Sequence, residues 1–278
     1  MKKFALIGHP IGHSMSPLIH RKLFALSGMD DCTYELIDIA PDDIPASGEL
    51  IRSHTGMNVT IPHKQSVIAL MDELDETAKR YNSVNCISCR DGKLTGYNTD
   101  CTGFLLSAAS LPLDGKVLLA GCGGVGRMMA IETALHGGRL TIGIIPQDRP
   151  LAEKARAEIL DMCPGASVDI AQISELDGDF DLMINATPVG MYPKTEACVI
   201  PDEVIGRCGS FFDAVYNPTD TLLLRKAKEL GKTGIGGAAM LVYQAVKAHE
   251  IWYGGKFSAQ DIAPIIGDVE KAVAGMNK

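Results

Sequence analysis

Short apolar segments alternate with longer amphipathic segments along the first third of the chain. Apolar residues at a helical spacing predict helices over residues 16–28 and 62–81. Two strand-like runs around Asp91-Gly92 predict a hairpin over residues 84–97. Further strands are predicted at residues 2–10, 32–40 and 56–61. Strands that alternate with helices are typical of an α/β fold with a mostly parallel sheet, to which the hairpin adds a mixed character.

The alternation becomes more regular after residue 101. Residues 115–121 (GKVLLAG) are almost continuously apolar, as expected of a strand buried on both faces. Helices and strands then follow in turn, which predicts a second, doubly wound parallel sheet. Two helices are predicted near the end, over 238–253 and 258–275. The expected divisions of the chain are residues 1–100, 101–237 and 238–278.

The composition is that of an ordinary globular protein, with 278 residues, 46% hydrophobic residues and a net charge of −8. No basic block or stripe predicts a nucleic-acid partner. The apolar runs are too short to span a membrane, and the N-terminus does not resemble a signal peptide. A cytoplasmic protein with free thiols is therefore expected. Cys86 and Cys89 form a C-x-x-C pattern, but residues three apart on a strand point to opposite faces, so no metal site is predicted.

Residues 121–126 (GCGGVG) fit the pattern G-x-G-x-x-G directly after a predicted buried strand and before a predicted helix. This context indicates a turn that holds the pyrophosphate of a dinucleotide at a helix N-terminus. The alternative is a glycine-rich turn that binds nothing. An acidic residue after the next strand would favour NAD and an arginine would favour NADP. Asp148 and Arg149 both lie slightly late for this position, so the sequence leaves the choice open.

Lys64 is unusual because it follows Pro62, a residue that is favoured at the first position of a helix. A cation is unfavourable in a first helical turn, although only by about 0.3–1 kcal/mol, so a solvated lysine is the simple alternative. Hydride transfer to or from a carbonyl also moves a proton, which requires a general acid or base. Lys64 is the candidate, and Asp100 is its candidate partner. Asp100 could equally be a helix N-cap.

Other polar residues have spacings that would bring them together. Asn58 and Thr60 share one face of a predicted strand, and Ser14 and Ser16 stand two apart before a helix, where Ser16 could simply be the N-cap. Gln244 lies on an apolar helical stripe and therefore needs a buried partner. Three histidines are interpreted as surface or capping residues rather than catalytic ones: His13, His20 and His63.

Eight segments, in order along the whole chain, resemble the shikimate dehydrogenase family, which includes quinate/shikimate dehydrogenases. The similar segments are GHSMSPLIH, NVTIPHK, SVNC, GYNTDCTGF, GCGGVG, NATPVGM, DAVYNPTDT and GGAAMLVYQA. The resemblance implies an N-terminal substrate-binding and catalytic domain, a Rossmann dinucleotide-binding domain, and C-terminal helices that pack back on the first domain.

The resemblance also implies a role for each matching residue. Lys64 and Asp100 would form the catalytic pair. The substrate would contact Ser14, Ser16, Asn58, Thr60, Asn85, Tyr216 and Gln244. The cofactor would contact Gly121, Cys122, Gly123, Gly124, Val125, Asn185, Ala186, Thr187, Ala214 and Gly237.

Two departures from the family pattern matter. NADP-dependent members commonly have Asn-Arg-Thr after the second Rossmann strand, where this chain has Ile144-Ile145-Pro146. The resemblance thus implies NADP but leaves NAD open. Asn82-Ser83 also replaces a usual Gly-Ala, and asparagine tolerates the left-handed backbone that such a turn needs.

Three functions follow as hypotheses. The first is an NAD(P)-dependent shikimate dehydrogenase that interconverts 3-dehydroshikimate and shikimate, as a monomer or homodimer. The second is an NAD-preferring dehydrogenase of quinate, shikimate or a related polyol acid. The third is a sensor that binds a shikimate-like acid and a nucleotide without turnover.

Overall fold

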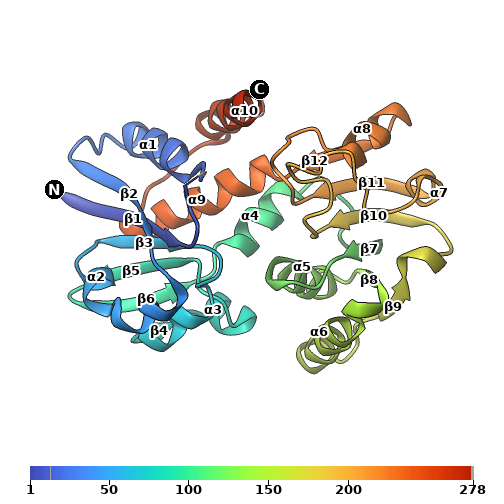
Figure 1. Cartoon of the computed structure of the whole chain (residues 1–278), viewed down its shortest axis with the longest axis horizontal. Helices are drawn as coiled ribbons and strands as arrows, with labels where there is room; N and C mark the ends of the chain where they lie inside the picture. The colour runs from blue at the N-terminus through green and yellow to red at the C-terminus, as the bar shows by residue number, and fades with distance from the viewer. Residues whose placement is uncertain (13, 277–278) are drawn as a thin grey trace. The chain divides into compact units, whose positions relative to one another are not determined.

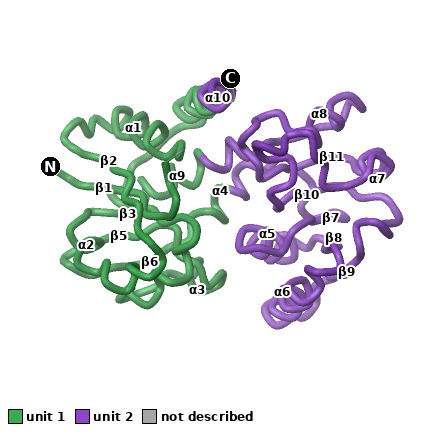
Figure 2. Tube along the Cα trace, viewed as in Figure 1, with its two compact units in different colours: residues 1–103, 242–269 green, residues 104–241, 270–278 purple. Residues whose placement is uncertain are grey.

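The computed structural model describes residues 1–12 and 14–276 and divides into two compact units (Figures 1 and 2). Unit 1 consists of residues 1–103 and 242–269, and unit 2 consists of residues 104–241 and the C-terminal residues from 270. The chain passes between the units within three helices: α4 (Asp100–Ser107), α9 (Ala238–Tyr253) and α10 (Ala259–Met276).

Unit 1 is built on a mixed six-stranded sheet with the order β2-β1-β3-β5-β6-β4. The strands are β1 (Lys2–Gly8), β2 (Cys32–Asp38), β3 (Gly56–Val59), β4 (Glu73–Leu74), β5 (Cys86–Arg90) and β6 (Lys93–Tyr97). β1 pairs in parallel with β2 and β3, whereas β5 is antiparallel to both β3 and β6. The hairpin therefore forms as predicted, with Asp91 and Gly92 at positive φ in its turn.

Helices α1 (Ser16–Leu26), α2 (Gly48–Arg52), α3 (Glu76–Tyr81), most of α9 and the first part of α10 also belong to unit 1. Phe4 of β1, Phe24 of α1 and Trp252 of α9 meet in one buried cluster. The Phe4 ring lies 4.9 Å from the Phe24 ring and 4.8 Å from the Trp252 ring. The Trp252 indole donates a hydrogen bond to the carbonyl of Ile87 at 2.9 Å, which attaches α9 to the sheet.

Unit 2 contains six parallel strands with the order β12-β11-β10-β7-β8-β9, which is a doubly wound sheet (Figure 1). The strands are β7 (Lys116–Ala120), β8 (Arg139–Ile144), β9 (Val168–Gln172), β10 (Phe180–Asn185), β11 (Cys208–Asp213) and β12 (Thr233–Gly236). The helices are α5 (Gly124–Leu135), α6 (Arg149–Met162), α7 (Asp202–Gly206) and α8 (Leu222–Glu229). Residues 117–120 of β7 are fully buried, as its apolar composition predicts.

The helix predicted over residues 62–81 is wrong. Residues 61–65 form turns, the 3₁₀ segment η2 (Ser66–Leu70) follows, and β4 then pairs with β6 before α3 begins. Asp75 caps α3 by accepting the backbone N–H of Ala78 at 2.8 Å. The apolar residues that suggested one helical stripe instead pack on the unit 1 core from these shorter elements. Tertiary burial thus overrides the local helical pattern.

The same finding changes the local setting of Lys64. Pro62 does not begin an α-helix, so Lys64 does not lie in a first helical turn. Its backbone carbonyl accepts the N–H of Val84 at 2.7 Å, which holds this turn against the segment before β5. Several short elements also carried no clear sequence signal: α2, α7, β4, β12 and the 3₁₀ segment η1 (Pro41–Ala46).

Candidate active site

Lys64 and Asp100 form an ion pair in unit 1. Lys64 lies in the turn between β3 and η2, and Asp100 is the first residue of α4. Lys64 Nζ lies 2.6 Å from Asp100 Oδ2, and the two side chains are 23% and 14% exposed. The pair is partly shielded from water, which strengthens the interaction, but it is not closed to a ligand. These two candidates are 36 residues apart in sequence and meet only through the fold.

Asn85 holds the second oxygen of Asp100. Its Nδ2 donates to Asp100 Oδ1 at 2.7 Å and to Thr99 Oγ1 at 3.1 Å, while its Oδ1 accepts the backbone N–H of Thr99 at 2.7 Å. Asn85 is only 3% exposed. Because both amide hydrogens are in use, the side chain has little capacity left for a ligand and acts mainly to orient Asp100.

Asn58 continues this network on the neighbouring strand. The hydroxyl of Tyr34 donates to Asn58 Oδ1 at 2.8 Å, and Asn58 Nδ2 donates to the carbonyl of Asn85 at 3.4 Å. Asn58 is 4% exposed. Hydrogen bonds therefore link Tyr34, Asn58, Asn85, Asp100 and Lys64 without interruption.

Gln244 reaches the same network from α9. The hydroxyl of Thr99 lies 3.5 Å from Gln244 Oε1, and both residues are buried. This contact supplies the polar partner that an amide on an apolar stripe requires. Thr60 follows β3 and is half-buried, and its backbone N–H is bonded to the carbonyl of Ile7 at 2.9 Å.

Ser14 and Ser16 lie at the start of α1. The prediction that Ser16 is the N-cap is wrong, because α1 begins at Ser16 and Met15 precedes it as the cap residue. Ser14 instead provides a side-chain acceptor, and its Oγ accepts the backbone N–H of Ser16 at 3.2 Å. The Ser16 hydroxyl is directed to Tyr34, where its hydrogen bond counteracts the rise that burial causes in the pKa of Tyr34.

The interpretation of the histidines is wrong for two of the three. His20 and His63 are fully buried. His20 Nδ1 lies 2.8 Å from His249 Nε2, and the His20 ring stacks on Tyr34 with 4.1 Å between centroids. His63 Nε2 lies 2.7 Å from the carbonyl of Ile39. His13 lies outside the described residues.

The glycine turn of unit 2 connects β7 to α5. Gly121 has φ +98°, and a Cβ on Gly126 would lie 2.0 Å from the Gly121 carbonyl oxygen, so both positions require glycine. Gly123 and Gly124 are exposed, and a Cβ on either would meet no atom within 4 Å. The backbone at the N-terminus of α5 is therefore open to a ligand, which fits the pyrophosphate of a dinucleotide.

The segment after β8 returns toward this turn. Residues Pro146–Asp148 form a 3₁₀ turn in which the Asp148 N–H is bonded to the carbonyl of Ile145 at 3.0 Å. Asp148 is half-buried, and its negative charge helps burial to raise the pKa of Cys122 to about 11. Arg149 lies at the start of α6, 3.8 Å from Glu153. Val125, the other non-glycine candidate, is half-buried in the first turn of α5.

Asn185, at the end of β10, shapes the loop that follows it. Its Nδ2 donates to Asp213 Oδ1 at 2.9 Å, and its Oδ1 accepts the N–H and the hydroxyl of Thr187 at 3.0 and 2.7 Å. Asp213 is fully buried at the end of β11 and also accepts from the Val215 N–H and the Thr221 hydroxyl. Burial raises the pKa of Asp213 to about 6, although these donors act in the opposite direction.

The remaining candidates lie at the same edge of the unit 2 sheet. The N–H of Ala186 is bonded to the carbonyl of Ala120 at 2.8 Å. A Cβ on Gly237 would lie 2.3 Å from the Ala214 carbonyl oxygen. Tyr216 is half-buried, and burial raises its pKa. Open α/β sheets bind ligands at the carboxyl ends of their strands, which is where the glycine turn and these residues stand.

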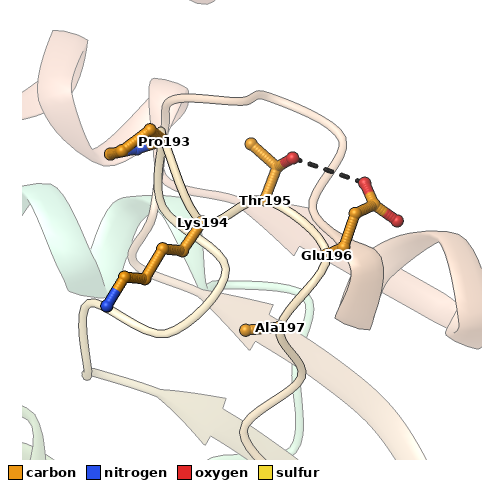
Figure 3. A pocket seen from close by; sticks show the side chains of 5 residues that line it. All are labelled: Pro193, Lys194, Thr195, Glu196 and Ala197. Atoms are coloured by element: carbon orange, nitrogen blue, oxygen red, sulfur yellow. Dashed lines mark hydrogen bonds between the residues drawn. The ribbon is translucent and has the colours of Figure 1, made fainter.

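Two small hollows lie outside these clusters. One, of about 270 Å³, is lined by residues 193–197 in the loop between β10 and α7 (Figure 3). Its polar side chains belong to a local arrangement in which the Thr195 hydroxyl donates to Glu196 at 3.3 Å. The other, of about 260 Å³, lies between α1 and β2 and includes one edge of Tyr34. Neither is lined by Lys64 or Asp100.

Comparisons with known proteins agree with these features. The family model described as "Shikimate dehydrogenase substrate binding domain" matches residues 6–87. A relative from Shouchella clausii named shikimate dehydrogenase (NADP(+)) is 35% identical over 268 residues, covering 92% of this chain and 94% of the relative. The chain belongs to the shikimate dehydrogenase family.

Solved structures of the shikimate dehydrogenase family match both units. The enzyme from Thermus thermophilus, in complex with NADP(H) and shikimate, has a TM-score of 0.86 at 29% identity, covering 97% of this chain and all of the other. The enzyme from Listeria monocytogenes, in complex with shikimate and NAD, has a TM-score of 0.84 at 26% identity, covering 98% and 96%. The two-domain α/β fold with a Rossmann domain, predicted from the sequence, is confirmed.

The sequence patterns did not identify three polar residues of these clusters, which are Tyr34, Thr99 and Asp213. Thr99 and Asp213 stand inside segments that carry the family resemblance, so their position next to Asp100 and at a strand end could have identified them. Tyr34 lies on an alternating strand far from any motif and carried no such signal.

Within residues 1–12 and 14–276, no group of three His, Cys, Asp or Glu side chains could hold a metal ion. The cysteines in this part of the chain are free thiols. No helix there combines the length and the apolar character needed to cross a bilayer.

Proposed function

We propose that this protein catalyses the reversible, NAD(P)-dependent reduction of 3-dehydroshikimate to shikimate. The observation that carries the proposal is the Lys64–Asp100 ion pair, 2.6 Å long and held by Asn85, in a chain of the shikimate dehydrogenase family. NADP is named for the Shouchella clausii relative and bound in the Thermus thermophilus structure.

The chain's own residues would move the proton of this reaction. A reduced nicotinamide dinucleotide, when bound, supplies the hydride that adds to the ketone carbon. The Lys64 ammonium gives one proton to the ketone oxygen, which becomes the hydroxyl of shikimate, and the neutral amine regains a proton from solvent. In the reverse direction Lys64 accepts the hydroxyl proton. Asp100 holds the lysine in place and stabilises its charged form.

The substrate would be oriented by the polar residues of unit 1, and the contact expected for Tyr216 stays a prediction. Ser14 would donate to the carboxylate, while Thr60, Gln244 and Asn58 would bind ring hydroxyls. Ser16 was also predicted to bind the carboxylate, but its hydroxyl is directed to Tyr34, which favours a role in holding Tyr34. Asn85 was predicted to bind a hydroxyl directly. Its occupied amide favours a different role, in which it orients Asp100.

The dinucleotide would be held by unit 2. The backbone of residues 121–125 would bind the pyrophosphate, since Gly123 and Gly124 leave it open. Asn185, Ala186, Thr187, Ala214 and Gly237 would border the nicotinamide. The division into a substrate domain (1–100), a dinucleotide domain (101–237) and C-terminal helices (238–278) that pack back on the first domain stays a prediction. A cytoplasmic location and a monomeric or homodimeric state also remain predictions.

Initial-rate kinetics with shikimate and each dinucleotide test the proposal. Turnover of shikimate with either NADP or NAD is expected, and Lys64→Ala is expected to abolish most of it. A wild-type protein that binds shikimate without steady-state turnover would instead be the sensor.

A second candidate, NAD preference, is favoured by the segment after β8. The family resemblance places Ile145 at the position where NADP-dependent members commonly have an arginine. The 3₁₀ turn brings Asp148 close enough to the glycine turn for its charge to act on Cys122. A carboxylate there would accept a ribose 2′-hydroxyl and repel a 2′-phosphate. Arg149 is instead directed toward Glu153.

The ratio of kcat/KM for NAD to that for NADP decides between the two cofactors. NAD preference predicts a ratio above one, which Asp148→Ser lowers by about tenfold, the effect of about 1.4 kcal/mol. Asp161→Ser, at an exposed position near the opposite end of α6, is the control and should leave the ratio unchanged. Quinate is assayed beside shikimate, because the second hypothesis also includes quinate. A ratio far below one that Asp148→Ser does not alter would leave NADP as the cofactor.

A further inference from the structure

Tyr34 contacts two residues of the candidate substrate site without belonging to it. It comes from β2, at one end of the unit 1 sheet, whereas Asn58 comes from β3 on the far side of β1. The Tyr34 hydroxyl donates to Asn58 Oδ1 at 2.8 Å and also interacts with the hydroxyl of Ser16. One phenol group therefore joins the start of α1 to β3.

The direction of these hydrogen bonds is fixed by the surroundings. The carbonyl of Asn85 can only accept, so the Asn58 side chain must present its NH₂ group to it. The opposite amide orientation would place two acceptor oxygens together. The Asn58 oxygen is thus the atom that faces Tyr34, and the Tyr34 hydroxyl must be the donor. The second Asn58 Nδ2 hydrogen would then be the one offered to a ligand.

The Tyr34 ring is itself held rigidly. The His20 ring is stacked on it at an interplanar angle of 11°, and His20 is in turn bonded to His249 of α9. His20 and His249 are both fully buried. An aromatic ring clamped in this way can hold its hydroxyl in one position, which a flexible side chain could not do at the same entropic cost.

We infer that Tyr34 is a positioning residue for the substrate, whose hydroxyl fixes the Asn58 amide so that an N–H donor is presented to a hydroxyl of the cyclic acid. This inference rests on the proposed function. Because Asn58 would bind the substrate before and during the reaction equally, losing its orientation should raise KM and leave kcat nearly unchanged.

Tyr34→Phe tests the inference, since it removes only the hydroxyl. The KM for shikimate is expected to rise about three- to tenfold, the effect of one net hydrogen bond, with kcat within about twofold of wild type. Asn58→Ala should raise KM by a similar or larger factor. The double variant should match Asn58→Ala alone, because Tyr34 acts through Asn58.

Tyr253→Phe is the matched control. Tyr253 also belongs to the buried aromatic cluster, but its hydroxyl contacts His249 and Ser27 instead of Asn58. It should leave KM unchanged. If Tyr34→Phe does not fold, 3-fluorotyrosine at position 34 replaces it. That residue keeps the hydroxyl as a stronger donor and should leave KM equal or lower.

Each outcome decides the question. An unchanged KM in Tyr34→Phe, factors that multiply in the double variant, or a raised KM with fluorotyrosine would overturn the inference while the proposed function stands. A wild-type protein that neither binds nor turns over shikimate would overturn both.

Discussion

The ion-pair cluster of unit 1 and the glycine turn of unit 2, both proposed to bind small molecules, are built by different means. Lys64, Asp100 and Asn85 come from three separate segments, and every contact among them is made by side chains. The glycine turn is one continuous segment. Its backbone N–H groups are accessible to a ligand because glycines have no side chains to cover them. One arrangement depends on long-range packing, whereas the other is almost entirely local.

This difference has consequences for how each region can be damaged. A partly buried network loses function when one member is removed, because its partners are left without hydrogen bonds. A backbone site loses function when a side chain is added. The following substitutions and titrations test this difference between the two units, from the largest expected effect to the smallest.

The largest effect is expected for Lys64→Ala. Removing the proton donor should lower kcat for shikimate oxidation by at least about 10²-fold, with a smaller change in KM. The measurement is initial-rate kinetics with saturating dinucleotide. Lys79→Ala is the control, because Lys79 is an exposed lysine of unit 1 that pairs with Glu76. A near-normal kcat in Lys64→Ala would remove the lysine from the mechanism.

The next effect is a loss of unit 1 stability in acid. Burial lowers the pKa of His249 to about 3, and burial followed by the nearby His249 lowers that of His20. The unfolded chain takes up these protons below about pH 6.5, so the stability they contribute is complete above that pH and is lost as pH falls toward 3. The depressed pKa of His249 alone should lower the free energy of unfolding by about 1.5 kcal/mol between pH 6.5 and 5.

Trp252 makes this loss measurable in unit 1. It is the only tryptophan of the chain, and its ring lies 5.4 Å from both histidine rings. Urea unfolding followed by its fluorescence at several pH values should show the acid loss, and His249→Gln should flatten it. His136→Gln, on the exposed end of α5, should not. An identical pH profile for His249→Gln would show that the buried pair does not determine acid stability.

A comparable effect is expected when a methyl group is added to the glycine turn. Gly123→Ala meets no protein atom, so the melting temperature should hold while KM for the dinucleotide rises about tenfold, a change of about 1.4 kcal/mol. Gly126→Ala meets the Gly121 carbonyl and should itself destabilise unit 2 by about 1–3 kcal/mol. Equal melting temperatures and equal KM values in both variants would contradict the assignment of separate roles.

The smallest effect is expected for Asp213, and its sign is opposite to that of the histidines. Its pKa is about 6 in the fold against an ordinary value of 3.8, so its contribution to stability is complete below 3.8 and is lost as pH rises through 6. The free energy of unfolding of unit 2 should fall by about 1 kcal/mol between pH 5 and pH 7. Asp213→Asn should remove this dependence, as measured by hydrogen exchange in β10 and β11. Asp161→Asn, at an exposed position of α6, is the control. If the stability of unit 2 still falls with rising pH in Asp213→Asn, Asp213 is not the cause.

The segment from residue 62 to residue 81 shows why sequence patterns need the fold. Its apolar residues have helical spacing, yet they are buried by a 3₁₀ turn, a two-residue strand and a short helix. The strand forms because β6 offers it a partner, and Asp75 then caps a new helix. Lys64 is therefore not in the first turn of a helix, although it does pair with Asp100.

The sequence by itself determined the parts of this protein that depend on neighbouring residues. These are the regular alternation of strands and helices in unit 2, the hairpin of unit 1, and the glycine turn with its flanking strand and helix, because each depends on residues that are close together in the sequence. Family resemblance added the candidate residues. Only the tertiary structure decided which of them touch, since hydrogen bonds between distant segments depend on how the sheets pack. That second group includes the hydrogen bond from Tyr34 to Asn58 and the occupied amide of Asn85. It also includes the closeness of Asp148 to Cys122, which follows from the pairing of β8 with β7.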